Sequence, residues 1–141
     1  MTDLSRFRDV DAAIHTRALA EITEGRKDSH WMWFVFPQLR GLGRSSTAQH
    51  YGLDVGEAAP FLADPLLGPR LTQISRALMA HAGKRSATAI FGPVDAQKLR
   101  SSMTLFASVP GADPVFAQVL AAFCDGPCPQ TLSVLNEQRP D

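Results

Sequence analysis

The chain has 141 residues, of which 45% are hydrophobic and 20% are charged. A chain of this length and composition buries about two-thirds of its unfolded surface as one domain, and it needs no disulfide or structural metal for stability. Its 14 basic and 14 acidic residues balance at a formal net charge of zero. This balance excludes a strong electrostatic attraction to nucleic acid or to an anionic membrane.

Targeting signals and metal motifs are both missing from the sequence. The first residues, MTDLSRFRDVDAA, lack the basic start and apolar run of a signal peptide, and no window approaches the roughly 20 apolar residues of a membrane span. We therefore expect a soluble cytoplasmic protein. Cys124 and Cys128 have no second Cys or His pair, and the 4 histidines are scattered. The sequence thus predicts two free thiols, no metal site and no cofactor.

Helical periodicity recurs along the chain. Apolar residues three and four apart predict a helix over 10–24, which Gly25 ends. Asp54 and Glu57 form a variant of the capping box before a short helix. Asp64 and Pro65 begin a longer helix that reaches about residue 82, and we expect it to be the central core helix. A brief apolar segment follows at 87–91, and further helices are predicted over 95–108, 113–123 and 131–135.

These segments amount to seven or eight short helices, without a convincing alternation of period two that would indicate strands. The sequence therefore predicts an all-α or α-dominated fold. We expect residues 1–141 to form a single domain, with its compact part over about 4–137.

The segment over 25–46, GRKDSHWMWFVFPQLRGLGRSS, is the part around which we expect the domain to be organised. It holds both tryptophans, Trp31 and Trp33, and two of the 8 phenylalanines, Phe34 and Phe36. Leaving such side chains in water would cost roughly 1.5–3 kcal/mol each, so the segment is buried or lines a pocket. Because Pro37 ends it and no partner strand is evident, we expect an irregular segment or a single helical turn.

This segment resembles the corresponding part of a bacterial family called domain of unknown function 1810. Three further stretches of the chain share the resemblance, namely LGPRL at 67–71, IFG at 90–92 and KLRSSMTLFA at 98–107. The resemblance runs from about Leu4 to Leu135. It implies a helical protein that is similar in fold to the NADAR group, whose members are linked to ADP-ribose derivatives and to removal of ADP-ribose from modified targets. The family's usual Phe-x-x-Ala-Gln string has Asp11 in place of its glutamine here, which would alter a ligand contact at that position.

Some members of this family carry the label calpastatin, which implies inhibition of calpain. Inhibitors of that name are expected to be disordered, whereas this composition is globular, so the label lacks physical support.

A nucleotide or ADP-ribose ligand needs flat surfaces for its base, donors for its phosphates and polar groups for its ribose hydroxyls. Aromatic side chains can supply stacking worth about 1–3 kcal/mol per base. The Gly41–Leu42–Gly43 turn can present a nest of backbone N–H groups, and three hydroxyls accompany an ammonium over 98–104. The predicted ligand-binding residues are Lys27, His30, Trp31, Trp33, Phe36, Gln38, Gly41, Gly43, Ser45, Ser46, Ser101, Ser102 and Thr104.

Cleavage of an N-glycosidic bond would require a carboxylate to activate water or to stabilise an oxocarbenium-like state. Glu57, Asp54 and Asp95 are candidates by position, and Glu57 with Lys98 is the catalytic pair that we predict. Capping also explains Glu57, and a helix start also explains Asp95. The motifs of serine hydrolases are missing, because Lys98 precedes Ser101 in the reverse of the required order.

The leading hypothesis is a small protein that binds, or binds and hydrolyses, an ADP-ribose or related nucleotide derivative. Neither a membrane nor free nucleic acid is an expected partner. Each candidate also has a structural explanation, because aromatic side chains can form the core, cations can be solvated and glycines can serve a turn. The rival hypothesis is a non-enzymatic protein-interaction module, in which the same aromatic side chains form a groove or a dimer face.

Overall fold

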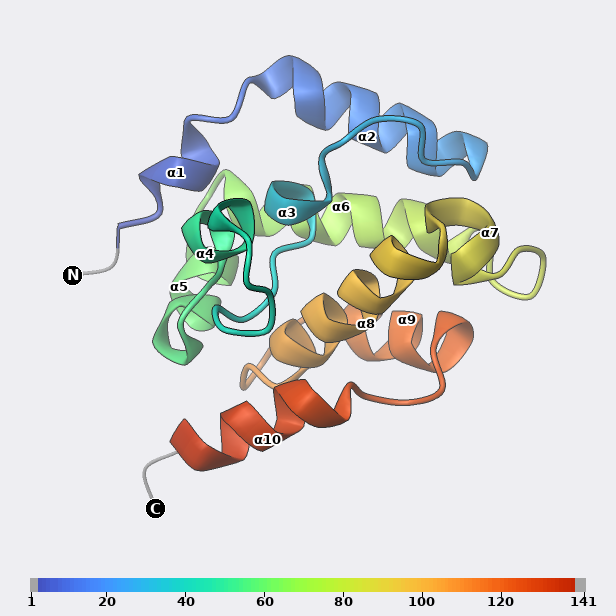
Figure 1. Ribbon diagram of the computed structural model, residues 1–141. Helices are drawn as coiled ribbons and strands as arrows, with labels where there is room; N and C mark the ends of the chain where they lie inside the picture. The colour runs from blue at the N-terminus through green and yellow to red at the C-terminus, as the bar shows by residue number, and fades with distance from the viewer. Residues whose placement is uncertain (1–2, 139–141) are drawn as a thin grey trace.

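The computed structural model describes residues 3–138, and within them it consists of ten α-helices and one 3₁₀ helix, without strands (Figure 1). The elements are α1 (Ser5–Arg8), α2 (Ala12–Glu24), α3 (Met32–Val35), α4 (Ser46–Tyr51), η1 (Val55–Glu57), α5 (Ala58–Ala63), α6 (Leu67–Met79), α7 (Ala87–Phe91), α8 (Pro93–Ala107), α9 (Val115–Phe123) and α10 (Pro129–Gln138).

The prediction of an all-α fold in one compact domain is confirmed. The helices outnumber the seven or eight expected because several are single turns, such as the four-residue α1 and α3. Periodicity cannot reveal so short a helix. Residues 1–2 and 139–141, which the predicted domain included, lie outside the described residues.

Helices α2 and α6 lie side by side along one layer of the domain (Figure 1). Asp11 begins α2, because its carboxylate accepts a hydrogen bond of 2.9 Å from the Ala13 N–H. Asp11, where the resemblance implies a glutamine, therefore has a capping function here. The Asp64 carboxylate likewise accepts the N–H groups of Leu66 and Leu67 at the start of α6.

Helix α8, and not α6, is the helix that is buried on most sides. Six consecutive residues from Ser101 to Phe106 are buried, and α5, α7, α9 and α10 all pack against this helix. Figure 1 shows it in front of α6 and α9 and above α10. The expectation that α6 would be the central helix was wrong. The hydroxyl residues of α8 interrupt the apolar pattern of α8, so its burial could not be recognised from the sequence.

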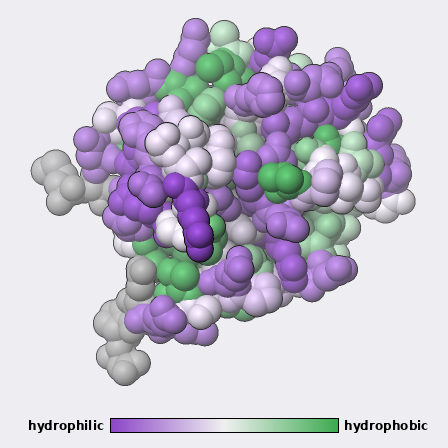
Figure 2. All heavy atoms as spheres, in the orientation of Figure 1, coloured by the Kyte–Doolittle hydropathy of each residue, from purple (hydrophilic) through white to green (hydrophobic). Residues whose placement is uncertain are grey.

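The surface mixes polar and apolar residues. Exposed large hydrophobic side chains among residues 3–138 are Leu66, Val94 and Leu132, which come from different parts of the chain. On the face drawn in Figure 2, hydrophilic residues predominate and hydrophobic ones form small separate areas. Within the described part of the chain, the helices are all too short or too polar to cross a membrane.

Candidate functional site

The aromatic segment forms one turn of helix, α3, and its two tryptophans have different environments. Trp31 is 1% exposed and packs against Phe36, which is also 1% exposed, and against Phe91. Trp33 is only half-buried. Trp31 and Phe36 are therefore core residues rather than the ligand-stacking surfaces that the sequence indicated, and Trp33 is the tryptophan that a ligand can reach.

A buried carboxylate, Glu21, holds the loop that precedes the aromatic segment. It accepts hydrogen bonds from the Asp28 N–H at 2.7 Å, the Ser29 N–H at 2.9 Å, the Ser29 hydroxyl at 2.6 Å and the Trp31 indole N–H at 2.9 Å. Burial alone would raise the pKa of Glu21, but these hydrogen bonds lower it to about 2. Glu21 is therefore ionised at neutral pH and fixes the position of the loop.

Glu21 was not among the residues predicted from the sequence. A signal for it exists, because it lies three residues after Ala18 and directly before Ile22, and all three are buried on the same face of α2. A carboxylate on an apolar helical face requires several hydrogen-bond donors, so its position predicts a polar network.

Two lysines share a single carboxylate beside this loop. Lys27 Nζ lies 2.9 Å from Asp95 Oδ2 and donates a hydrogen bond of 2.6 Å to the Ser29 carbonyl. Lys98 Nζ lies 3.1 Å from Asp95 Oδ1, one turn along α8. Burial alone would raise the pKa of Asp95, but the two ammonium groups hold it below its usual range. The cluster Lys27–Asp95–Lys98 thus carries two positive charges and one negative charge.

The cluster is joined to both indole rings. Lys27 Nζ lies 4.9 Å from the ring centroid of Trp31, and Lys98 Nζ lies 4.0 Å from that of Trp33, so both pairs are cation–π contacts. The Lys27 side chain is 7% exposed and that of Lys98 is 20% exposed. Lys27 is therefore the inner cation, and Lys98 is the outer one that shares the surface with Trp33.

The turn after the aromatic segment lies against Trp33. A Cβ added at Gly43 would be 3.7 Å from Trp33 Cη2 and only 2.7 Å from the Ala48 Cβ, so close packing requires glycine there. Gly41 has a φ of +98°, which favours glycine for the turn itself. Ser45 caps α4 by accepting the Ala48 N–H at 3.1 Å, and Ser46 is exposed. The turn thus lies next to the half-buried Trp33 ring. Close packing and a positive φ are sufficient to explain its two glycines, without a ligand.

The hydroxyl cluster on α8 points into the protein. Ser101, Ser102 and Thr104 are all buried. The Ser101 hydroxyl donates to Cys128 Sγ at 3.4 Å, and Thr104 Oγ1 accepts the Cys128 N–H at 2.9 Å. The contacts of Ser101 and Thr104 attach the segment before α10 to α8, and the burial of all three residues corrects their predicted contact with a ligand.

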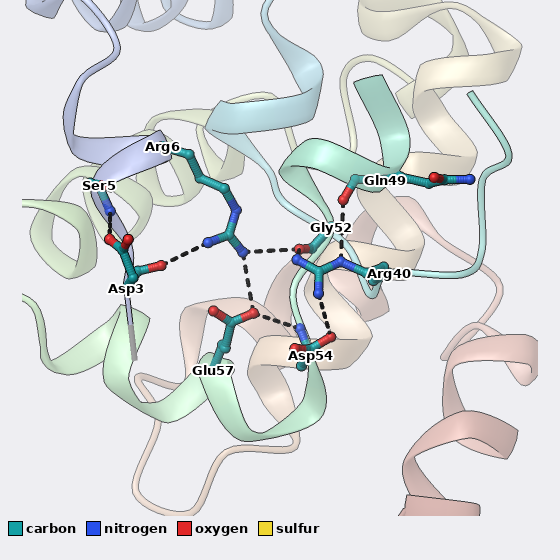
Figure 3. Close-up of polar contacts among 8 residues, drawn as sticks. All are labelled: Asp3, Ser5, Arg6, Arg40, Gln49, Gly52, Asp54 and Glu57. Carbon is teal, nitrogen blue, oxygen red and sulfur yellow. Dashed lines mark hydrogen bonds and ion pairs between the residues drawn. The ribbon is translucent and has the colours of Figure 1, made fainter. Parts of the chain in front are cut away.

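Glu57 belongs to a different network, which Figure 3 shows. Its Oε1 accepts the Asp54 N–H at 2.9 Å, which completes a capping box, and lies 3.2 Å from a guanidinium nitrogen of Arg6. Arg6 and Arg40 both donate to the Gly52 carbonyl at 3.0 Å, and Arg40 also pairs with Asp54 at 2.9 Å. No hydrogen bond or ion pair within residues 3–138 joins Glu57 to Lys98, the other half of the predicted catalytic pair.

The remaining predicted residues have simple surroundings. His30 is exposed, and the Gln38 carbonyl accepts the Leu53 N–H at 2.9 Å in an isolated bridge. In the described part of the chain, His, Cys, Asp and Glu side chains do not gather in a group that could hold a metal ion. Cys124 and Cys128 are free thiols.

The fold and this site define a small all-α protein in which a lysine pair, a shared aspartate and a half-buried tryptophan meet beside a glycine-containing turn. The chain belongs to the family described as protein of unknown function (DUF1810), whose model matches residues 1–135. It is similar to the conserved hypothetical protein Rv1873 from Mycobacterium tuberculosis, with 43% identity, a TM-score of 0.90, and coverage of 95% of this chain and 96% of that one. Curated proteins show no match to the chain.

Proposed function

We propose that the protein binds an ADP-ribose-like nucleotide derivative at the surface that Trp33 and Lys98 form. The observation that carries the proposal is the Lys98 ammonium, 4.0 Å from the centre of the half-buried Trp33 ring and 3.1 Å from a carboxylate that a second lysine already neutralises. The surplus positive charge suits a phosphate, and the indole suits a planar base or nicotinamide.

The two lysines differ in burial and therefore in function. Lys27 is almost fully buried, and its N–H donates to the Ile90 carbonyl at 2.8 Å, so its segment is fixed against α7. It therefore orients Asp95 from the inside. Lys98 covers one face of Trp33, so the ligand's planar group would stack on the part of the ring that stays exposed while its phosphate approaches the ammonium.

Binding has better support than hydrolysis. Asp95 and Glu21 both have lowered pKa values and are deprotonated at neutral pH, so neither can donate a proton to a leaving group. Glu57 is engaged by Arg6 and by the Asp54 N–H. Cleavage of an N-glycosidic bond at this site would therefore need a leaving group that departs without a proton from the protein.

The test is a titration with ADP-ribose, NAD and ATP, followed by tryptophan fluorescence and by thermal shift. Saturable binding stabilises the native state in proportion to the logarithm of ligand concentration over Kd. We expect Lys98→Gln to weaken ADP-ribose binding about tenfold, which corresponds to the loss of one charge-assisted hydrogen bond. Lys84→Gln is the control, because Lys84 is exposed and its side chain makes no ion pair within residues 3–138.

Two outcomes would contradict the proposal. One is the lack of any fluorescence or thermal response to all three compounds at millimolar concentration. The other is an equal loss of affinity in the Lys98→Gln and Lys84→Gln variants, which would indicate only a general charge effect. Either result would favour the protein-interaction hypothesis for this surface.

A further inference from the structure

A second polar site lies between α2 and α6, and its residues are distinct from those of the Trp33 surface. A cavity of about 150 Å³ is lined there by His15 and Thr16 from α2 and by Arg70 and Gln73 from α6, with apolar residues between them. Arg70 is part of the LGPRL sequence, which the proposed nucleotide site does not use.

The guanidinium of Arg70 is the unusual group in this cavity. Its Nη1 nitrogen is buried, and no group of residues 3–138 accepts a hydrogen bond from it. The other cations without an ion pair in the described part of the chain are exposed, as Arg44, Lys84 and Arg85 are, or bonded to carbonyl groups, as Arg100 is. A buried charged donor without an acceptor is costly, so the cavity is built for an acceptor that the described chain does not supply.

We propose that this cavity is a binding site for a small oxyanion, a phosphate-type or carboxylate group, with Arg70 as its main ligand. A guanidinium presents two parallel N–H donors that match such a group. Gln73 can add amide donors from the same helix, one turn away. The Thr16 hydroxyl, in contrast, already donates to the Ala12 carbonyl at 3.3 Å.

The size of the cavity restricts the occupant. A volume of 150 Å³ corresponds to roughly five water molecules and lies below the roughly 300 Å³ at which pockets for larger organic ligands begin. A whole nucleotide therefore does not fit. The occupant is a free small anion or one anionic end of a longer molecule, and this site is separate from the proposed nucleotide surface.

His15 makes the occupancy measurable. Burial and, to a smaller extent, the positive charge of Arg70 together lower the pKa of His15 from 6.5 to about 4. An anion next to Arg70 would offset that charge and raise the pKa of His15. By linkage, anion binding then takes up a proton, so it becomes tighter as the pH falls from neutral through the raised pKa of His15 toward about 4.

The experiment titrates the protein with sodium sulfate and, separately, with sodium acetate at constant ionic strength. The readouts are calorimetry and the His15 ring resonance, assigned with the His15→Gln variant. We expect saturable binding, a raised His15 pKa, and about tenfold weaker binding in Arg70→Gln but not in Arg44→Gln, which removes an equal charge at an exposed position. Preference for sulfate would assign a phosphate-type occupant, and preference for acetate a carboxylate.

Further variants separate folding from binding. Arg70→Lys retains the charge and loses the paired donors, so it should bind more weakly than the wild type and more tightly than Arg70→Gln. His15→Gln should bind at neutral pH without the increase at lower pH. An unchanged His15 resonance at high sulfate and acetate, or equal affinity in Arg70→Gln and the wild type, would overturn the proposal and leave a cavity that holds water only. Neither result depends on the nucleotide titration.

Discussion

Two polar networks in this protein use similar groups for different purposes. The network in Figure 3 sets the guanidinium groups of Arg6 and Arg40 against the carboxylates of Asp54 and Glu57, so that cations and anions balance. Backbone groups take up the remaining hydrogen bonds, including the Gly52 carbonyl that both arginines share. Such a network connects α1 to the segment before α5 and leaves little attraction for an outside charge.

The cluster Lys27–Asp95–Lys98 has one carboxylate for two ammonium groups, and both cations lie against indole rings. The two networks contain similar charged groups, so the presence of such groups does not by itself indicate a binding site. What differs is the balance between cations and anions and the presence of an accessible aromatic ring. A network whose charges balance is explained by its role in holding parts of the fold together. A surplus cation beside an accessible aromatic ring is suited to an anionic, planar ligand. Four predictions test or refine this comparison.

The largest expected effect comes from Glu21, which fixes the loop that carries Lys27. Glu21→Ala removes the acceptor of three N–H donors and a hydroxyl, and we expect it to lower the free energy of unfolding by about 3–4 kcal/mol. Urea unfolding at neutral pH measures this. The matched control is Glu24→Ala, an exposed position on the same helix, with an expected change within about 0.5 kcal/mol. Similar losses in the two variants would contradict the role of Glu21.

The lowered pKa of Glu21 also predicts a pH dependence. Its folded-state pKa of about 2 lies below the ordinary 4.5, so its stabilising contribution is complete above pH 4.5 and is lost as the pH falls toward 2. The shift corresponds to about 3 kcal/mol. The difference in unfolding free energy between the wild type and Glu21→Gln should therefore shrink as the pH is lowered from 7 to about 3. A constant difference would show that the carboxylate charge is not involved.

Replacing one aspartate in each network by asparagine compares the stability that the two networks contribute. Asp95→Asn removes the counter-charge of two lysines, one of them 7% exposed, and we expect a loss of about 2 kcal/mol. Asp54→Asn breaks a pair whose side chains are 42% and 60% exposed and leaves a good N-cap residue, so we expect less than about 0.5 kcal/mol. Chemical denaturation of both variants decides the point. The reverse order of the two losses would refute the distinction between the networks.

Glu57→Gln is expected to cost less stability than Asp95→Asn. The amide retains the acceptor for the Asp54 N–H, so only the ion pair with Arg6 is lost, at a cost of about 0.5–1 kcal/mol in stability. Affinity for ADP-ribose should not change. A variant that keeps its stability but no longer binds the nucleotide, or no longer releases ADP-ribose from a substrate that the wild type cleaves, would place Glu57 in the site after all.

Some of this organisation is readable from the sequence. Periodicity and end signals predicted the helix over 10–24, which the structure has as α2. Pro37 and the lack of a partner strand predicted an irregular segment or a single turn in the aromatic segment, and the structure has the single turn. The central position of α8 was hidden because Ser101, Ser102 and Thr104 appear polar, whereas the hydroxyls of Ser101 and Thr104 bond to the segment before α10.

The candidate site was harder to predict because its parts are distant in the chain. Lys27 and Asp95 are brought together by tertiary packing, which no local spacing encodes. The sequence alone also could not distinguish Trp31 from Trp33. That difference follows from which indole N–H faces the buried carboxylate of Glu21.

The central claim is that a nucleotide ligand meets Trp33 and not Trp31, and the two indole N–H resonances of a ¹⁵N-labelled sample test it directly. The Trp31 N–H is bound to Glu21, whereas that of Trp33 has no hydrogen-bond partner within residues 3–138. Titration with ADP-ribose should shift the Trp33 resonance in a saturable manner and leave that of Trp31 nearly unchanged. A shift of Trp31 alone, or no shift of either resonance at millimolar ligand, would contradict the account.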